Sequence, residues 1–171
     1  MAILNKEEAK AILQKIINLS KAESVVANLG GRNGGNIRYA RNTVTTAGVE
    51  TNTSLSVTSN FGKKSGGASI NELDDAALER VVRRSEELAQ FSPENPEFMP
   101  PLEAQEFKES ITFKQSTADI TAEDRTKIAE SSIGPAKKSG VVAAGFQEDY
   151  NGFGSMMNSK GLFAYLSLIH I

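Results

Sequence analysis

The chain has 171 residues, and its 19 Lys and Arg against 21 Asp and Glu give a formal net charge of −2 at pH 7. This length suits one domain or two small ones. The near-neutral charge predicts no binding to nucleic acid or to an anionic membrane, because both need clustered Lys and Arg. There is no Cys and one His, His170, so disulfides, thiol nucleophiles and two-histidine metal sites are excluded from these residues. The start of the chain shows neither the basic segment nor the apolar run of a secretory signal, and we expect a cytoplasmic protein.

A helix is predicted over residues 5–19. Its apolar residues recur at the spacing of one helical stripe, and Asn5 with Glu8 forms a capping-box pattern at its start. The stripe consists of Ala9, Ile12, Leu13, Ile16 and Ile17. We expect this helix to pack on the core as a scaffold element.

Residues 22–70 change to a strand-like pattern. Four short stretches rich in β-branched residues are expected to form an antiparallel meander: 24–29, 37–44, 51–59 and 64–70. The glycine-rich stretch 30–35 is predicted to be a wide hairpin turn, because it lacks the G-x-G-x-x-G spacing of a nucleotide site and no helix follows it. Similarly, residues 62–65 lack the upstream glycine of a phosphate-binding P-loop, since position 57 is Val.

The second half of the chain is expected to repeat a helix-then-sheet order. Asp74 caps a helix that runs to about Phe91, with Leu78, Val81, Val82, Leu88 and Ala89 facing inward and its charged residues, Glu86 included, largely outward. A connector over 92–118 holds four of the five prolines. Thr121 with Asp124 then opens a helix to about Lys138, followed by strands at 141–147, 154–158 and 161–165.

These elements predict an α+β fold: a helix, a four-strand antiparallel meander and a helix, then a second helix plus an incomplete antiparallel sheet. The expected divisions are an N-terminal subdomain over 1–91, the Pro-rich connector 92–118, the start of a second subdomain over 119–165, and a separate segment 166–171.

Segment 166–171, Leu-Ser-Leu-Ile-His-Ile, resembles the translation of the start of a common transposase-based sequencing adapter. We expect it to be foreign to the natural protein, in which case 171 − 6 = 165 residues are genuine and none is His. The alternative is a true edge strand, since the segment half alternates between apolar and polar residues.

Candidate chemical groups are few. The carboxylate pairs Asp74/Asp75, Glu86/Glu87 and Glu148/Asp149 lack the spacing of a calcium-binding loop, so we expect them to be solvated or to cap helices. The Arg83/Arg84 pair has the same interpretation as a charged helix face. No catalytic, cofactor-binding or metal-ligating residue is predicted.

The order and spacing of several short motifs resemble the N-terminal region of the TldD/PmbA family, across nearly all of residues 20–165. These are Arg38-Tyr-Ala-Arg41-Asn42-Thr-Val, Gly48-Val-Glu50, Ser54-Leu-Ser-Val, Phe61-Gly62-Lys63-Lys64-Ser-Gly66-Gly67, the helix from Asp74 to Ala89, Val141-Val-Ala-Ala-Gly145-Phe and Asn158-Ser-Lys-Gly161-Leu-Phe-Ala-Tyr165. The region is only the front part of a family member.

The resemblance implies a cytoplasmic zinc metallopeptidase, named as a modulator of DNA gyrase, that hydrolyses short or unfolded peptides. It also implies a heterodimer of a TldD-like catalytic subunit and a PmbA-like subunit without the zinc motif, with self-association as the alternative. The family's His-Glu-x-x-x-His motif and its zinc-ligating Cys lie C-terminal to these residues, so zinc is expected in the full-length protein and not in this chain. Two alternative functions remain: a PmbA-like structural or substrate-presenting partner, and a stand-alone α+β binding module.

Overall fold

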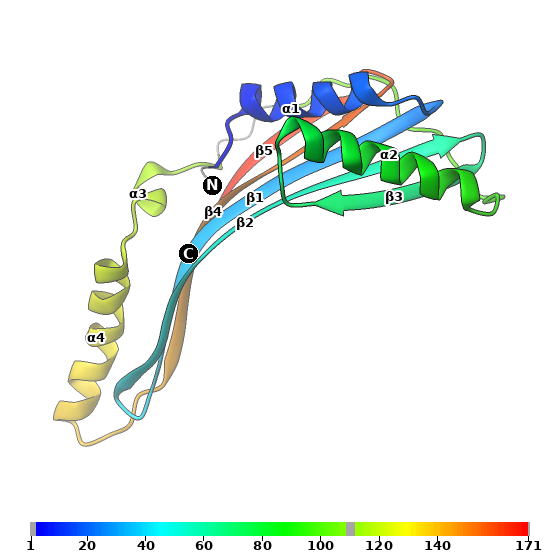
Figure 1. Ribbon diagram of the computed structural model, residues 1–171. Helices are drawn as coiled ribbons and strands as arrows, with labels where there is room; N and C mark the ends of the chain where they lie inside the picture. Colours follow the sequence, from blue (N-terminus) through cyan, green and yellow to red (C-terminus); the bar gives the residue numbers. More distant parts are fainter. Residues whose placement is uncertain (1–2, 109–111, 171) are drawn as a thin grey trace.

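The computed structural model describes residues 3–108 and 112–170, without the side chains of residues 168–170. These ranges contain a five-stranded antiparallel sheet in the order β3-β2-β1-β4-β5 and four helices (Figure 1). The α+β class is confirmed. No helix within the described ranges is long and apolar enough to span a membrane.

The three long helices begin where their capping residues predict. Helix α1 (Lys6–Leu19) starts after Asn5, whose side chain accepts the N–H groups of Glu7 and Glu8. Helix α2 (Asp75–Phe91) follows the cap Asp74, and α4 (Ala122–Lys138) follows a capping box of Thr121 and Asp124. The short helix α3 (Gln115–Ala118) lies within the expected connector and was not predicted.

The predicted four-strand meander is wrong in its strand count. Strands β1 (Ser24–Ala40), β2 (Thr43–Phe61) and β3 (Lys64–Ile70) replace it, and residues 30–35 run through the middle of β1. The turn between β1 and β2 is made instead by Arg41 and Asn42, at φ 51° and 60°. The glycines stay extended because β1 is hydrogen-bonded on both sides, so that Gly31 pairs with Thr53 and with Phe153.

The strands expected in a second unit join this same sheet. Strand β4 (Gly145–Asn158) pairs with β1, and β5 (Phe163–His170) pairs with β4. The stretches 141–147 and 154–158 are therefore not two strands, because one strand runs from Gly145 to Asn158 and residues 141–144 lie before it. The backbone of residues 166–170 continues β5, as the edge-strand alternative predicts, and this does not test whether the segment is foreign to the natural protein. Ile171 lies outside the described residues.

The sheet bends into an arch whose outer side carries the helices (Figure 1). Helices α1 and α2 cover one half, here called the body, which holds the large apolar cluster of residues such as Leu13, Leu29, Leu55 and Val81. Helix α4 packs on the other half, here called the arm, which comprises residues 34–50 and 145–151. A smaller cluster of Ile37, Ala129 and Ile133 holds it there.

Two side chains of α2 differ from their predicted exposure. Leu88 is half-buried and not fully inward, and Glu86 is buried at 6% exposure where an outward position was expected. The Glu86 carboxylate accepts the backbone N–H of Lys21 at 2.5 Å and an Arg83 guanidinium N–H at 2.6 Å. These hydrogen bonds join the segment that follows α1 to helix α2.

Candidate functional site

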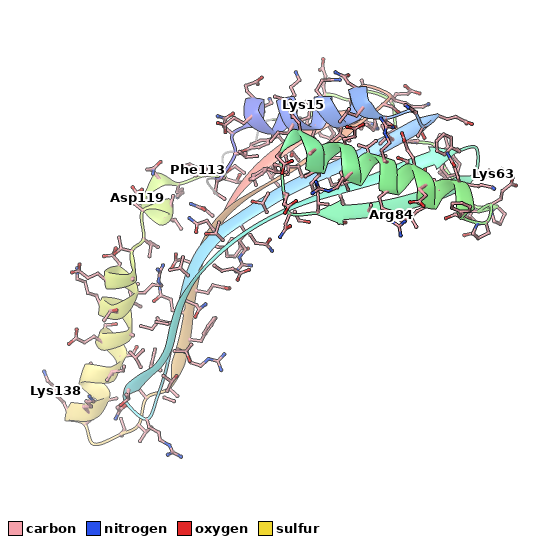
Figure 2. The ribbon with its side chains drawn as sticks, viewed as in Figure 1. Lys15, Lys63, Arg84, Phe113, Asp119 and Lys138 are labelled. Carbon is pink, nitrogen blue, oxygen red and sulfur yellow. The ribbon has the colours of Figure 1, made fainter. Side chains whose placement is uncertain are left out.

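The face of the sheet opposite the helices, here called the uncovered face, carries no helix along the described part of the chain. Figure 2 shows side chains projecting from this inner side of the arch with no ribbon over them. The alternation of side chains along each strand explains why the two faces of the sheet differ. Leu29 and Leu55, paired across β1 and β2, point to the helices, so their neighbours Asn28 and Ser56 point the other way.

A groove of about 670 Å³ lies on the body half of the uncovered face. We call it the sheet groove. Its floor crosses β2, β1, β4 and β5, and its wall is completed by residues of the connector after α2. Among its lining residues are Asn28, Ser54, Ser56, Met156, Leu166, Phe107 and Lys108.

The groove presents hydrogen-bonding groups beside an apolar wall. In residues 3–108 and 112–170, the side chains of Asn28, Ser54 and Ser56 form no hydrogen bond with the protein. Lys108 is the one charged residue that lines the groove within the same ranges. The arrangement can therefore bind an uncharged polar ligand or an anionic one.

Arginine–aromatic stacks continue the uncovered face along the arm. The guanidinium of Arg32 lies 4.0 Å from the ring centre of Tyr150 and bonds a carboxylate oxygen of Glu148 at 2.6 Å. Further along, Arg38 lies 5.3 Å from the ring centre of Phe146. By strand alternation, these stacks lie on the same face of the sheet as the groove.

A buried ion pair lies on the opposite side of the arm. One guanidinium nitrogen of Arg125, on α4, bonds both carboxylate oxygens of Asp149, on β4, at 2.9 Å each, and both side chains are 7% exposed. Gly35 makes this possible, because a Cβ there would lie 2.2 Å from the central carbon of the guanidinium. The pair fixes α4 to the sheet.

The carboxylate pairs considered in the sequence do not converge. Asp74 caps α2 while Asp75 pairs with Lys15, and Glu148 and Asp149 project to opposite faces of the sheet toward Arg32 and Arg125. Across the described ranges, no three His, Cys, Asp or Glu side chains come close enough to hold a metal ion.

Two groups have displaced pKa values, each with a local cause. The Asp124 carboxylate accepts the hydroxyl and the backbone N–H of Thr121, which lowers the pKa of this carboxyl below its ordinary value. Burial raises the pKa of the Tyr165 phenol, whose hydroxyl donates to the carbonyl of Leu4 at 2.8 Å. Both groups therefore lie at the start of a helix: Asp124 in the cap of α4, and Tyr165 against Leu4, which precedes the cap of α1.

Sequence reasoning missed the Arg125–Asp149 pair, although the signal was present. Arg125 occupies the same helical stripe as Ala129, Ile133 and Ala136, the residues of α4 that are buried with it. A charged residue on a buried stripe predicts a buried partner. The sheet groove had no such signal, because its residues come from separate parts of the chain.

One family model matches part of this chain. Residues 29–89 match the family model described as PmbA/TldA metallopeptidase domain 1. No curated protein matches the chain.

Three solved structures share the fold at low sequence identity. TldE from Thermococcus kodakarensis is 11% identical with a TM-score of 0.82, and the match covers 93% of this chain and 36% of that one. A proposed modulator of DNA gyrase from Thermotoga maritima is 14% identical (TM-score 0.78, 94% and 37% covered). A similar protein from Bacteroides thetaiotaomicron is 12% identical (TM-score 0.78, 95% and 39% covered).

This chain thus spans little more than a third of each of these structures. At this low identity the structural similarity establishes the fold alone, while the family model covers most of β1, all of β2 and β3, and most of α2. The resemblance to the TldD/PmbA family is therefore confirmed, by the family model over residues 29–89 and by the shared fold over most of the chain.

Proposed function

We propose that this chain is the non-catalytic N-terminal portion of a TldD/PmbA-type zinc metallopeptidase that hydrolyses peptides or unfolded proteins in the cytoplasm. The match of residues 29–89 to domain 1 of a metallopeptidase carries the proposal. Zinc and its ligands would belong to a C-terminal region, since the described residues hold no metal cluster. A second TldD- or PmbA-like subunit is the expected partner.

In this proposal the uncovered face lines the cavity by which peptides reach the catalytic residues. The face is rich in hydroxyl and amide side chains, whereas surfaces that pack permanently on another domain are mainly apolar. A polar, concave wall is suited to a water-filled passage. The outer helices would then serve only to hold the sheet in its curved shape.

The test uses the complete gene product, alone and together with its candidate partner subunit. We expect cleavage of an unstructured peptide, measured by mass spectrometry, that stops on treatment with a chelator and returns with zinc. A complete product that binds no zinc but restores cleavage when added to a TldD-like subunit would support the alternative PmbA-like role. A product that binds no zinc and cleaves nothing with any partner would refute both.

A further inference from the structure

We propose that the sheet groove binds an extended peptide segment by its backbone and holds a carboxylate of that peptide beside Lys108. The inference rests on the proposed function, in which peptides are the ligands, and extends it by naming the site and the preferred charge. Three features of the groove support it: the shape of its floor, the polar side chains that have no hydrogen-bond partner in the described residues, and the positive charge of Lys108.

Few side chains protrude from the floor of the sheet groove, because small residues cross it. Gly30 pairs with Ser54 on one side and with Gly154 on the other, which places three small residues in one row across the sheet. A Cβ at Gly154 would have no atom within 4 Å, so packing does not require glycine there. Glycine within a strand often marks the close approach of another backbone.

The dimensions suit a short extended segment. The floor crosses four neighbouring strands, and three inter-strand spacings of about 4.8 Å give about 14 Å. At about 3.3 Å per residue, an extended peptide of about four residues would cross it. Helices α1 and α2 lie on the other face of the sheet and therefore do not limit the length of a bound peptide.

The lining matches a peptide backbone better than it matches specific side chains. Asn28 can donate and accept hydrogen bonds, and so can the hydroxyl groups of Ser54 and Ser56, which have no partner within the described ranges. Met156 and Phe107 offer apolar contact on the same surface. Such a lining binds N–H and C=O groups with little dependence on sequence.

Charge selects the class of peptide. Lys108 lines the groove and no carboxylate does, among the residues that the structure describes. The next charged residue along β1 on the same face is another cation, Arg32, already paired with Glu148. A peptide with a free carboxylate is therefore favoured over its amidated form, and a basic peptide is disfavoured.

The experiment measures fluorescence anisotropy of labelled five-residue peptides of Gly, Ala, Ser and Leu with the intact protein, in the presence of chelator. Binding is thereby separated from cleavage, so failure of the proposed hydrolytic function leaves this test readable. We expect the peptide with a free C-terminal carboxylate to bind about two- to fivefold more tightly than its amide, the range of an exposed ion pair. Lys108→Gln should remove that difference and leave the amide unaffected.

Two further variants separate the groove from the rest of the surface. Gly154→Leu raises the floor and should weaken both peptides at least about tenfold. Lys15→Gln, on α1 over the other face of the sheet, is the matched control and should change neither. Thermal melts check that each variant is folded.

Three results would overturn the proposal: unchanged binding to a folded Gly154→Leu variant, equal affinity for acid and amide, or equal losses in the Lys15 control. A photo-crosslinker at position 56 supplies a separate check. Capture of the added peptide supports the proposal. Capture of another segment of the same chain, or of a second copy, identifies a different occupant and refutes it.

Discussion

At the residue scale, the buried ion pair of Arg125 and Asp149 stabilises the arm, because each buried charge is compensated by the other. Removing one partner leaves the other charge buried and unpaired, which costs about 3–5 kcal/mol in comparable pairs. We expect Arg125→Met or Asp149→Leu to lower the free energy of unfolding by that amount in urea titrations. The double variant should lose clearly less than the sum of the two. Lys127→Ala, which breaks only the exposed pair with Glu123, is the control and should cost at most about 1 kcal/mol.

Two adjacent glycines of β3 provide a second test at this scale. A Cβ on Gly66 would lie 2.1 Å from the backbone nitrogen of Ala89 on α2, whereas a Cβ on Gly67 has no atom closer than 3.8 Å. Gly66→Ala should therefore cost about 1–3 kcal/mol or more, because backbone must move. Gly67→Ala should stay within about 0.5 kcal/mol. Equal effects would show that α2 does not lie as close to β3 as described.

At the element scale, the cap of α4 makes its stability depend on pH. The pKa of Asp124 is lower in the folded protein than in the unfolded chain, because Thr121 donates to its ionised form. This contribution is present above the unfolded pKa and is lost as the pH falls through the folded pKa. Between about pH 6 and pH 3, we expect wild type to lose more thermal stability than Asp124→Asn. Parallel decreases would mean that the cap does not titrate.

The same scale shows what the sequence could and could not predict. The starts of α1, α2 and α4 follow from Asn5, Asp74 and Thr121, since capping residues act within one turn and are local signals. The continuity of β1 through Gly31 depends on pairing with β2 and β4, and β4 is more than a hundred residues away. The groove could not be predicted for the same reason, because it joins Asn28, Ser56 and Met156 only after folding.

At the scale of the whole molecule, the two halves of the arch have unequal support. Two helices and a large apolar cluster stabilise the body. In the described residues, the arm is stabilised by α4 and a cluster of three buried side chains. Local opening should therefore be easier in the arm. We expect hydrogen exchange to be faster for residues 36–40 than for residues 25–29, although both belong to β1. Uniform protection along this strand would show that the sheet opens only as a unit.

The position of β1 at the centre of the sheet also constrains synthesis. Its partner β2 follows it directly, but β4 ends at Asn158, so one edge of β1 stays unpaired until some 118 further residues (158 − 40) have been added. At about 5–20 residues per second, that interval lasts roughly 6–24 seconds. During it the nascent chain exposes a seventeen-residue edge that can pair with any other extended chain. A ribosome that stalls before β4 is complete would therefore release a product prone to aggregate, and chaperones that shield strand edges would act on this protein between the emergence of Ala40 and that of Asn158.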